Sequence, residues 1–352
     1  MAVSKGALDA YILMSMHRIE RLYYDTSGSC YLSFSGGKDS TVVLAIIKMC
    51  EDIGTIPKNA IPAVYCDTKI ELGATEEFVK WVQANYYSNL QIIKPKKLFP
   101  QIIKESGKPM KSKMRSVALW YNQNKPELKT GKGLYDPDFI NSNRVKLGNR
   151  DYHLAHPKFD IRVADECCNV LKKDPFSTYA KENNILGYFT GMRAEEGGKR
   201  AYGYEKRLKE GKSPCTTCNK DGIIHRMPII DWTDEIVEAF VKEYNVPLSK
   251  AYTEYGLERT GCFLCPYGKD IKGKLENLYK NEPNRYKAAL FYMQDVYIAQ
   301  GVELLWDKDY MAKFKEKWKD YEVMRYEMLK KYRPCCQLVK RYEKAHGIKG
   351  GE

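Results

Sequence analysis

The sequence has no apolar run that approaches the ~20 residues needed to span a bilayer, and no internal repeat is visible along its 352 residues. Its first residues, MAVSKGALDAYILMSMHRIERLYY, lack the pattern of a cleavable signal peptide and have that of an amphipathic helix. These absences argue against a membrane-spanning or exported chain. We therefore expect a cytoplasmic protein with no membrane partner.

Nothing in the composition indicates disorder. Hydrophobic residues make up 43% of the chain and charged residues 29%, as is typical of globular proteins. The length suffices for one large domain or two ordinary ones. A formal net charge of +13 and a pI near 9.0 favour an anionic partner such as a nucleotide, a nucleic acid or an acidic protein, without choosing among them.

The first hundred residues alternate between strand-like and helix-like segments. Strands are expected at 29–35, 61–66 and 90–95, and helices at 39–51 and 72–86. Alternation at this spacing predicts a parallel sheet with helical crossovers. The fold class we expect is therefore α/β, with a doubly wound, Rossmann-like parallel sheet.

Two stretches interrupt this alternation, at about 122–160 and 196–221, where Asn, Gly, Pro and charged residues accumulate. Beyond the second one, DWTDEIVEAFVKEY has the signals of a helix start, with Thr233 as the candidate N-cap and acidic residues in the first turn. The rest of the chain is helical and aromatic. We expect one domain over 1–268, with the two interruptions as irregular insertions, and a helical C-terminal region over 269–352.

The segment SFSGGKDST, residues 33–41, connects the first strand to the first helix of this pattern. Its glycines allow backbone N–H groups to approach an anion, its serines add hydroxyl donors, and Lys38 and the helix N-terminus add positive potential. Asp39 suits such a site if it fixes the loop or holds a cation shared with the phosphates. The spacing is neither G-x-x-x-x-G-K-[ST] nor G-x-G-x-x-G. The segment predicts a phosphate site of another type.

This loop resembles the S-G-G-x-D-S loop of the adenine nucleotide alpha-hydrolase (PP-loop) superfamily. Three later segments resemble the phosphoadenosine phosphosulfate (PAPS) and adenosine phosphosulfate (APS) reductase family within it. YCDTKIELGATEEFVKW is similar to D-T-G-x-x-F-P-E-T, and TGMRAEEGGKR to G-x-R-x-x-E-S-x-x-R, with Gly197 in place of the serine. MPIIDWTDEIVEAF…TGCFLCP is similar to the family's W-T … G-C-x-x-C stretch. The matches cover roughly 25–100 and 160–270.

The resemblance implies an adenine nucleotide, which is PAPS, APS or ATP. It places Asp67 and Thr68 beside the adenosine. We place Arg193 and Arg200 on the substrate anion, because a planar guanidinium can donate to two sulfate or phosphate oxygens at once; a surface ion pair is the alternative for each. The full expected nucleotide set is Ser35, Gly36, Gly37, Lys38, Asp39, Ser40, Asp67, Thr68, Gly191, Arg193 and Arg200.

Eight of the eleven cysteines occur in four pairs, a pattern that indicates metal or redox chemistry. The pairs Cys167-Cys168 and Cys262/Cys265 resemble the arrangement of the iron–sulfur reductases, which implies four ligands for a [4Fe–4S] cluster. The pair Cys215/Cys218 leaves three interpretations open. It could form a zinc site with Cys262/Cys265, replace Cys167 or Cys168 as a cluster ligand, or act as a redox pair. Lys172 would offset the charge of a four-thiolate cluster.

The sequence lacks the E-C-G-x-H tail that carries the nucleophilic cysteine of the reductases. The pair Cys335-Cys336 is the terminal candidate, and its basic neighbours would lower a thiol pKa; a structural role is equally open. We expect catalytic roles for Lys38, Asp39, Arg193 and Cys336.

The favoured function is reduction of a sulfonucleotide. A thiol attacks sulfur, an adenosine phosphate leaves, and a thioredoxin-like reductant regenerates the thiol and releases sulfite. In the alternative, the loop binds ATP with Mg²⁺, adenylates an oxygen and expels pyrophosphate, so that sulfur can be delivered to a nucleic acid, as in tRNA thiolation or DNA phosphorothioation. A third hypothesis is a nucleotide-sensing module without catalysis.

Overall fold

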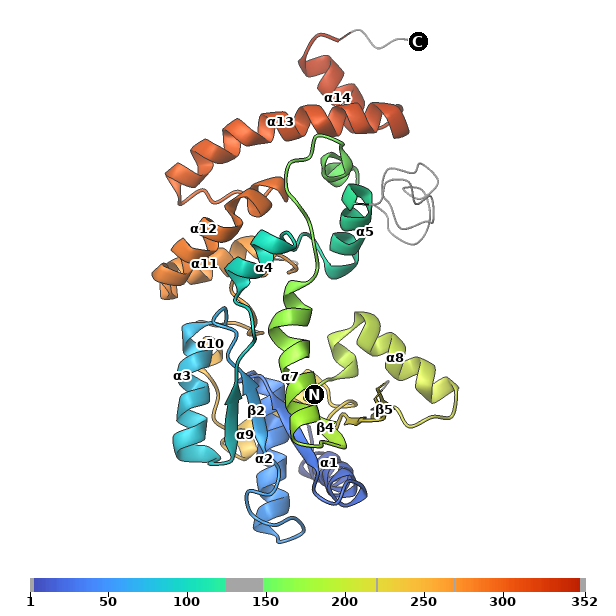
Figure 1. Cartoon of the computed structure of the whole chain (residues 1–352), viewed down its shortest axis with the longest axis vertical. Helices are drawn as coiled ribbons and strands as arrows, with labels where there is room; N and C mark the ends of the chain where they lie inside the picture. The colour runs from blue at the N-terminus through green and yellow to red at the C-terminus, as the bar shows by residue number, and fades with distance from the viewer. Residues whose placement is uncertain (1–2, 125–147, 220, 269, 349–352) are drawn as a thin grey trace. The chain divides into compact units, whose positions relative to one another are not determined.

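The computed structural model describes residues 3–124, 148–219, 221–268 and 270–348, and the chain forms two compact units (Figure 1). The sheet unit comprises Met1–Lys96 and Leu171–Gly261, and the helical unit comprises Lys97–Val170 and Cys262–Glu352. The units thus group residues 97–170 with the C-terminal helices, whereas the sequence placed them with the sheet. Residues 125–147, in the first expected insertion, lie outside the described residues.

The sheet has six strands in the order β3-β2-β1-β4-β6-β5. All neighbouring strands are parallel except β5 and β6, which are antiparallel. The predicted α/β class with a largely parallel sheet is confirmed. The strands are β1 (Cys30–Phe34), β2 (Ala63–Cys66), β3 (Leu90–Ile93), β4 (Gly187–Phe189), β5 (Thr216–Cys218) and β6 (Ile224–Arg226).

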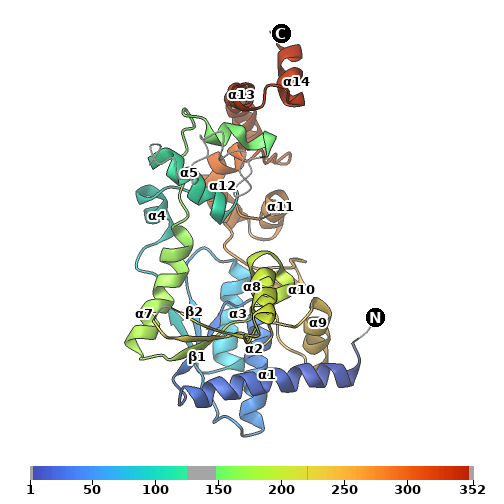
Figure 2. The ribbon, with the colours of Figure 1, turned by 90° about the vertical axis from the view of Figure 1, so that its right-hand side faces the viewer.

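Helices cover both faces of the sheet. Alternate residues of a strand point to opposite faces, so neighbouring residues of one strand pack against different helices. In β1, Leu32 and Phe34 pack in a core shared with the helices α1 (Lys5–Asp25), α2 (Lys38–Asp52) and α9 (Asp234–Glu243). Tyr31 packs instead in a second cluster with residues of α7 (Asp174–Glu182). Figure 2 shows α7 on one side of the sheet and α2 and α9 on the other. The sheet is therefore doubly wound.

The sheet unit contains further helices. They are α3 (Gly73–Trp81), which continues into a π-turn (Val82–Tyr86), then α8 (Gly198–Lys209), α10 (Lys250–Thr253) and a short 3₁₀ turn (Ala194–Glu196). Helix α3 contributes Phe78 and Val79 to the core shared with α2 and α9. The predicted N-cap of α9 is confirmed, because the Thr233 hydroxyl accepts a hydrogen bond from the Ile236 N–H at 3.4 Å. Helix α8 occupies part of the stretch expected to be irregular. None of its residues with described burial is fully buried, and two glycines and six charged residues weaken the helical pattern of its sequence.

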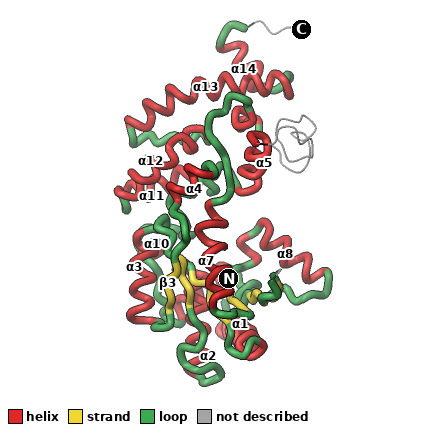
Figure 3. The backbone as a smooth tube through the Cα atoms, in the orientation of Figure 1, coloured by secondary structure: helices red, strands yellow, loops and turns green. Residues whose placement is uncertain are grey.

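The helical unit is built from α4 (Phe99–Glu105), α5 (Lys113–Asn124), a 3₁₀ helix (Asn149–Ala155), α11 (Ile271–Asn281), α12 (Pro283–Ala299), α13 (Lys308–Tyr332) and α14 (Gln337–Ala345). The strands, yellow in Figure 3, all belong to the sheet unit within the described part of the chain. The C-terminal helices agree with the sequence pattern. None of the helices described here combines the length and the apolar character that crossing a membrane requires.

Candidate functional site

The loop Ser35–Ser40 leaves the carboxyl end of β1 and enters α2. Gly36 adopts φ +70°, and a Cβ at this position would lie 2.9 Å from the methyl groups of Thr75 and Val79. Glycine is therefore required both by the backbone conformation and by the packing of α3 against the loop. Strand β1 lies between β2 and β4, where the strand order reverses direction. In open α/β sheets this is the position at which ligands bind.

Two serine hydroxyls hold the loop in shape. The Ser35 N–H donates to Ser40 Oγ at 3.2 Å, and the two hydroxyl oxygens are 3.0 Å apart. Ser40 Oγ donates to the Gly37 carbonyl at 2.9 Å, and the Gly37 N–H donates to Ser35 Oγ at 3.3 Å. Ser40 is buried, whereas Ser35 is exposed. Ser40 therefore shapes the loop, and Ser35 is the hydroxyl that a ligand can reach.

The segment after β4 lies directly on the first turn of α2. A Cβ on Gly191 would lie 2.6 Å from the carbonyl carbon of Asp39 and 2.7 Å from the backbone nitrogen of Ser40. Any larger residue would push the two backbones apart. Gly191 thus brings the second predicted motif against the phosphate loop.

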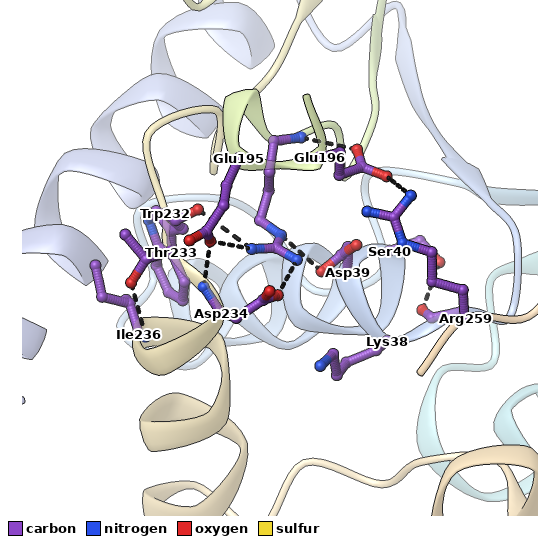
Figure 4. A network of polar contacts seen from close by, with 12 residues as sticks. Lys38, Asp39, Ser40, Glu195, Glu196, Trp232, Thr233, Asp234, Ile236 and Arg259 are labelled. Atoms are coloured by element: carbon purple, nitrogen blue, oxygen red, sulfur yellow. Dashed lines mark hydrogen bonds and ion pairs between the residues drawn. The ribbon is translucent and has the colours of Figure 1, made fainter. Parts of the chain in front are cut away.

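Arg193 follows in this segment, and its side chain is only 4% exposed. Its Nε donates to Asp39 Oδ1 at 2.9 Å, and its Nη2 donates to Asp234 Oδ1 at 2.5 Å. Its Nη1 donates to Glu195 Oε2 at 3.1 Å and to the Trp232 carbonyl at 3.3 Å (Figure 4). The guanidinium is therefore surrounded by acceptors of this chain and holds Asp39 in place. Direct contact between Arg193 and a substrate anion stays a prediction.

The carboxylates around Arg193 differ in their electrostatics. Burial raises the pKa of Asp39, and the nearby Glu196 adds to this, although the charge of Arg193 opposes both. The hydrogen bond from Arg193 lowers the pKa of Asp234, which is more exposed. The stabilisation that the Arg193–Asp39 ion pair provides is thus partly offset by the free-energy cost of removing Asp39 from water.

Glu196 connects this cluster to two further arginines. Its carboxylate forms ion pairs with Arg200 and, at 3.4 Å, with Arg259, and it accepts a hydrogen bond from the Arg193 N–H at 3.3 Å. Both Arg200 and Arg259 have exposed side chains. An anion that entered here could take over these guanidinium groups from Glu196.

Two cavities open on either side of the loop. The polar cavity has a volume of about 950 Å³, and its lining includes Gly37, Lys38, Asp39, Arg193, Arg200 and Arg259. The aromatic cavity has a volume of about 510 Å³, and its lining includes Tyr31, Phe34, Tyr65, Phe176 and Tyr188. Ser33 and Ser35 line both. A ligand that passed over Ser35 could therefore occupy the two cavities together.

Asp67 and Thr68, which the sequence places beside the adenosine, follow β2. Asp67 pairs with Lys69 at 2.5 Å, and the buried Thr68 hydroxyl donates to Glu71 at 3.2 Å. Glu71 lines the aromatic cavity and pairs with Lys172 at 2.9 Å. Lys69 stands where the family motif has glycine and adopts φ +62°, a conformation that favours glycine.

The cysteines Cys167, Cys168, Cys262 and Cys265 all belong to the helical unit. A hydrogen bond with Cys168 and burial raise the pKa of the Cys167 thiol, as do the charges of Cys168, Cys265 and Cys262. The thiols of Cys168, Cys262 and Cys265 thus lie near enough to Cys167 to influence its charge. Within the described ranges, however, no three His, Cys, Asp or Glu side chains lie at metal-ligand spacing. By their chemistry, four thiols are a donor set suited to iron–sulfur or zinc.

Side chains of α11 and α12 hold the turn between Cys262 and Cys265 through its backbone carbonyls. The Cys265 N–H donates to the Cys262 carbonyl at 3.1 Å, and Lys274 Nζ of α11 donates to the Cys262 and Cys265 carbonyls at 2.6 and 3.1 Å. Tyr297 of α12 donates its hydroxyl to the Leu264 carbonyl at 3.2 Å. These contacts preorganise the turn and place a cation beside the thiols.

The pair Cys215/Cys218 lies at β5. Cys215 is buried against Met227 and Ile230, whereas Cys218 is exposed. Residues three apart on an extended strand point to opposite faces, so this strand does not bring the two thiols together. Burial raises the pKa of Cys215, but hydrogen bonds with Ser213 and Thr216 outweigh it, and the pKa is lowered overall.

The terminal pair lies in the helical unit. Cys335 is exposed, and Cys336 is the N-cap residue of α14. The Asn149 side-chain amide donates to Cys336 Sγ at 3.2 Å. A catalytic role for Cys336 stays a prediction.

Sequence reasoning missed several polar neighbours of the loop. Tyr252 and Thr260 line the polar cavity, and Glu195 and Asp234 bind Arg193. Tyr252 and Asp234 lie within segments that resemble the family, so the resemblance could have indicated that these two residues belong to the site. Their partners could not be read from it, because residues far apart in the sequence make these contacts.

The chain is similar to several known proteins. A family model described as the phosphoadenosine phosphosulfate reductase domain matches residues 29–125 and 140–267. An uncharacterized protein of Methanocaldococcus jannaschii is 25% identical over 266 residues, which are 75% of this chain and 41% of that protein. An adenosine 5′-phosphosulfate reductase of Burkholderia cepacia is 26% identical over 105 residues, which are 30% of this chain and 37% of that enzyme.

Among solved structures, a phosphoadenylyl-sulfate reductase from Candida auris, in complex with phosphate, has a TM-score of 0.42 and 17% identity, and the match covers 74% of this chain and 97% of that one. The chain spans half or less of the length of the curated relatives it matches. The family model, in contrast, covers more than half of this chain. The chain belongs to the phosphoadenosine phosphosulfate reductase family.

Proposed function

We propose that this protein is an enzyme that binds an adenine nucleotide with its phosphoryl or sulfonyl end over the loop Ser35–Ser40. The observation that carries the proposal is the close approach of this loop to the segment that begins at Gly191. A Cβ added to Gly191 would lie only 2.6–2.7 Å from the backbone of Asp39 and Ser40. Lys38, Arg200 and Arg259 supply positive charge in the polar cavity at this point. Anionic groups would bind there through the helix N-terminus and these cations.

The aromatic cavity suits the nucleoside. In its lining, Tyr31 stacks with Phe176 and with Tyr188, and a base could extend this stack from the half-buried Phe176. Ser33 and Ser35 lie between the two cavities, so a nucleotide could extend from one to the other. The volume of about 510 Å³ is in the range of small-molecule sites.

The reaction favoured by family membership is reduction of PAPS or APS. A thiolate attacks the sulfur, the S–O bond to the phosphate breaks, and an adenosine phosphate leaves with that electron pair. A second thiol, from a thioredoxin-like protein, attacks the first sulfur, so that sulfite leaves and a disulfide forms. Cys336 is the candidate for the first thiol in this chain.

The thiols of Cys167, Cys168, Cys262 and Cys265 would hold a [4Fe–4S] cluster in the helical unit. Such a cluster would compensate the mutual repulsion of four thiolates and cross-link the segments that carry them. Lys274 binds the carbonyls of Cys262 and Cys265, and its charge would favour thiolates there.

Carboxylates at the loop support a second candidate function. Asp39 and Glu196 line the same cavity as Lys38, and Mg²⁺ is typically bound by one or two carboxylates together with substrate phosphates. The nucleotide would then be ATP, pyrophosphate would leave, and the activated oxygen would belong to an acceptor such as a nucleic acid. The net charge of +13 fits a polyanionic acceptor.

One assay separates the two reactions. The purified protein is incubated with PAPS and a thioredoxin system, or with ATP and Mg²⁺, and sulfite and pyrophosphate are measured. Sulfite supports the reductase and pyrophosphate supports the second candidate. Neither product, together with no binding of PAPS, APS or ATP, would refute the proposed enzyme.

The contribution of Lys38 can be tested by binding. Lys38→Ala removes a half-buried cation from the polar cavity, and we expect nucleotide affinity to fall about tenfold, as for the loss of a charged hydrogen bond. Lys80→Ala, on the exposed side of α3, is the matched control and should bind like the unaltered chain. Equal affinity in both variants would contradict the assignment of the loop.

A further inference from the structure

The first backbone N–H of α2 already has a partner from this chain. The Lys38 N–H donates to the Tyr252 hydroxyl at 2.9 Å, and Lys38 is the first residue of the helix. The first N–H groups of a helix have no partner within the helix and are the groups that bind anions. The phenol oxygen of Tyr252 therefore occupies the position in which a phosphoryl oxygen would be expected.

A second hydroxyl supports Tyr252 in this position. Thr260 Oγ1 lies 3.2 Å from the Tyr252 hydroxyl. A Cβ on Gly37 would lie 3.1 Å from Thr260 Oγ1 and 3.2 Å from Tyr252 Oη. Both hydroxyls thus lie directly over Gly37, and both residues line the polar cavity. An anion cannot reach the Gly37–Lys38 backbone from this side unless they move.

The start of α10 is anchored to α3. The Ser249 hydroxyl donates to the Ala74 carbonyl of α3 at 2.9 Å and accepts from the Ala251 N–H at 3.3 Å. Farther along, Gly256 is exposed, and nothing lies within 4 Å of an added Cβ. Rotation of the Tyr252 side chain into the polar cavity, which it lines, would uncover the loop while the N-cap residue Ser249 stays in place.

We propose that Tyr252 is an internal competitor for the anion site, whose hydroxyl satisfies the Lys38 N–H until the phosphoryl group of a nucleotide or of pyrophosphate displaces it. The inference rests on the proposed nucleotide site and adds a residue that sets its affinity. A ligand loses part of its binding free energy in displacing Tyr252. The cost is the same for every anion that must displace Tyr252, so Tyr252 would lower the affinity of the site for nucleotides and for small anions by a similar factor.

Calorimetric titration of the full chain with ATP and with inorganic pyrophosphate tests this. Tyr252→Phe keeps the ring and removes the competing oxygen, and we expect both ligands to bind about fivefold more tightly, as for one neutral hydrogen bond. Thr260→Val removes the supporting hydroxyl and should shift affinity in the same direction by a smaller factor. Tyr244→Phe, an identical change at an exposed position of the same unit, should leave affinity unchanged.

The outcomes separate this inference from the proposed function. If the unaltered chain binds and Tyr252→Phe binds equally or more weakly, the competitor role is overturned and the nucleotide site remains. If neither chain binds ATP or pyrophosphate, the inference fails, and titration with PAPS and APS decides whether the proposed nucleotide site fails with it. If Tyr252→Phe alone binds, both are supported. Thermal unfolding of each variant identifies any loss of fold. Thr260→Val gives a second, independent measurement of the direction in which affinity changes.

Discussion

At the scale of single residues, the site depends on close backbone approach and on one buried cation. Arg193 contacts Asp39, Glu195 and Asp234, so in this structure it positions the carboxylate beside the phosphate loop. Gly191 makes that arrangement possible, because its backbone lies against Asp39 and Ser40 where no Cβ fits.

Gly191→Ala should therefore destabilise the site. The added Cβ would approach the backbone of Asp39 and Ser40 to 2.6–2.7 Å, and we expect a loss of about 1–3 kcal/mol in the free energy of unfolding, as for overpacking of a tight core, together with weaker nucleotide binding. Urea unfolding and titration measure the two effects. Gly203→Ala, where nothing lies within 4 Å, is the control and should be neutral or slightly stabilising. Similar losses in both variants would show that the close approach at Gly191 is unimportant.

At the scale of elements, buried polar groups connect helices that are distant in sequence. His153, in the 3₁₀ helix Asn149–Ala155, is 1% exposed, and its Nε2 lies 2.7 Å from the Ala299 carbonyl at the end of α12. Burial lowers the pKa of His153 to about 4. The ring is thus neutral in the folded state, and its Nε2 donates to the carbonyl.

This lowered pKa predicts an acid-sensitive helical unit. The folded pKa of about 4 lies below the ordinary value of 6.5, so the unfolded chain binds the proton more readily. The contribution of the neutral His153 ring to the free energy of unfolding is fully present above pH 6.5 and is lost as the pH falls toward 4. Urea unfolding at pH 7 and pH 4.5 should show a smaller pH dependence for His153→Phe, which fits among the neighbouring rings of Phe159, Trp318 and Tyr321. An unchanged pH dependence would contradict the assignment to His153.

At the scale of the whole molecule, each of the two units is built from two separate segments of the chain. The four cysteines Cys167, Cys168, Cys262 and Cys265 belong to the helical unit, two in each of its segments. A group bound by these thiols would hold the two segments together.

Metal analysis of anaerobically purified protein tests this arrangement. We expect a brown protein with iron and acid-labile sulfide, and Cys262→Ser should lose most of both, because a ligand of the cluster is removed. Cys218→Ser changes an exposed cysteine of the sheet unit and should retain them. Colourless protein that contains zinc would contradict the cluster, and equal loss in both variants would contradict the ligand set.

Local signals were sufficient for much of this protein. The sequence by itself determined the alternation of strands and helices, the glycine-containing turn before α2, the Thr233 cap and the C-terminal helices, because hydrophobic period, capping residues and glycine act over a few neighbouring residues. It did not determine that α8 is a helix, because glycines and charged residues weaken the helical pattern of that segment. Nor did it determine that residues 97–170 join the C-terminal helices, that Arg193 is surrounded by carboxylates, or that Tyr252 covers the Lys38 N–H. These features were decided by the tertiary structure, because each depends on contacts between segments that are far apart in the chain, and local patterns carry no information about such partners.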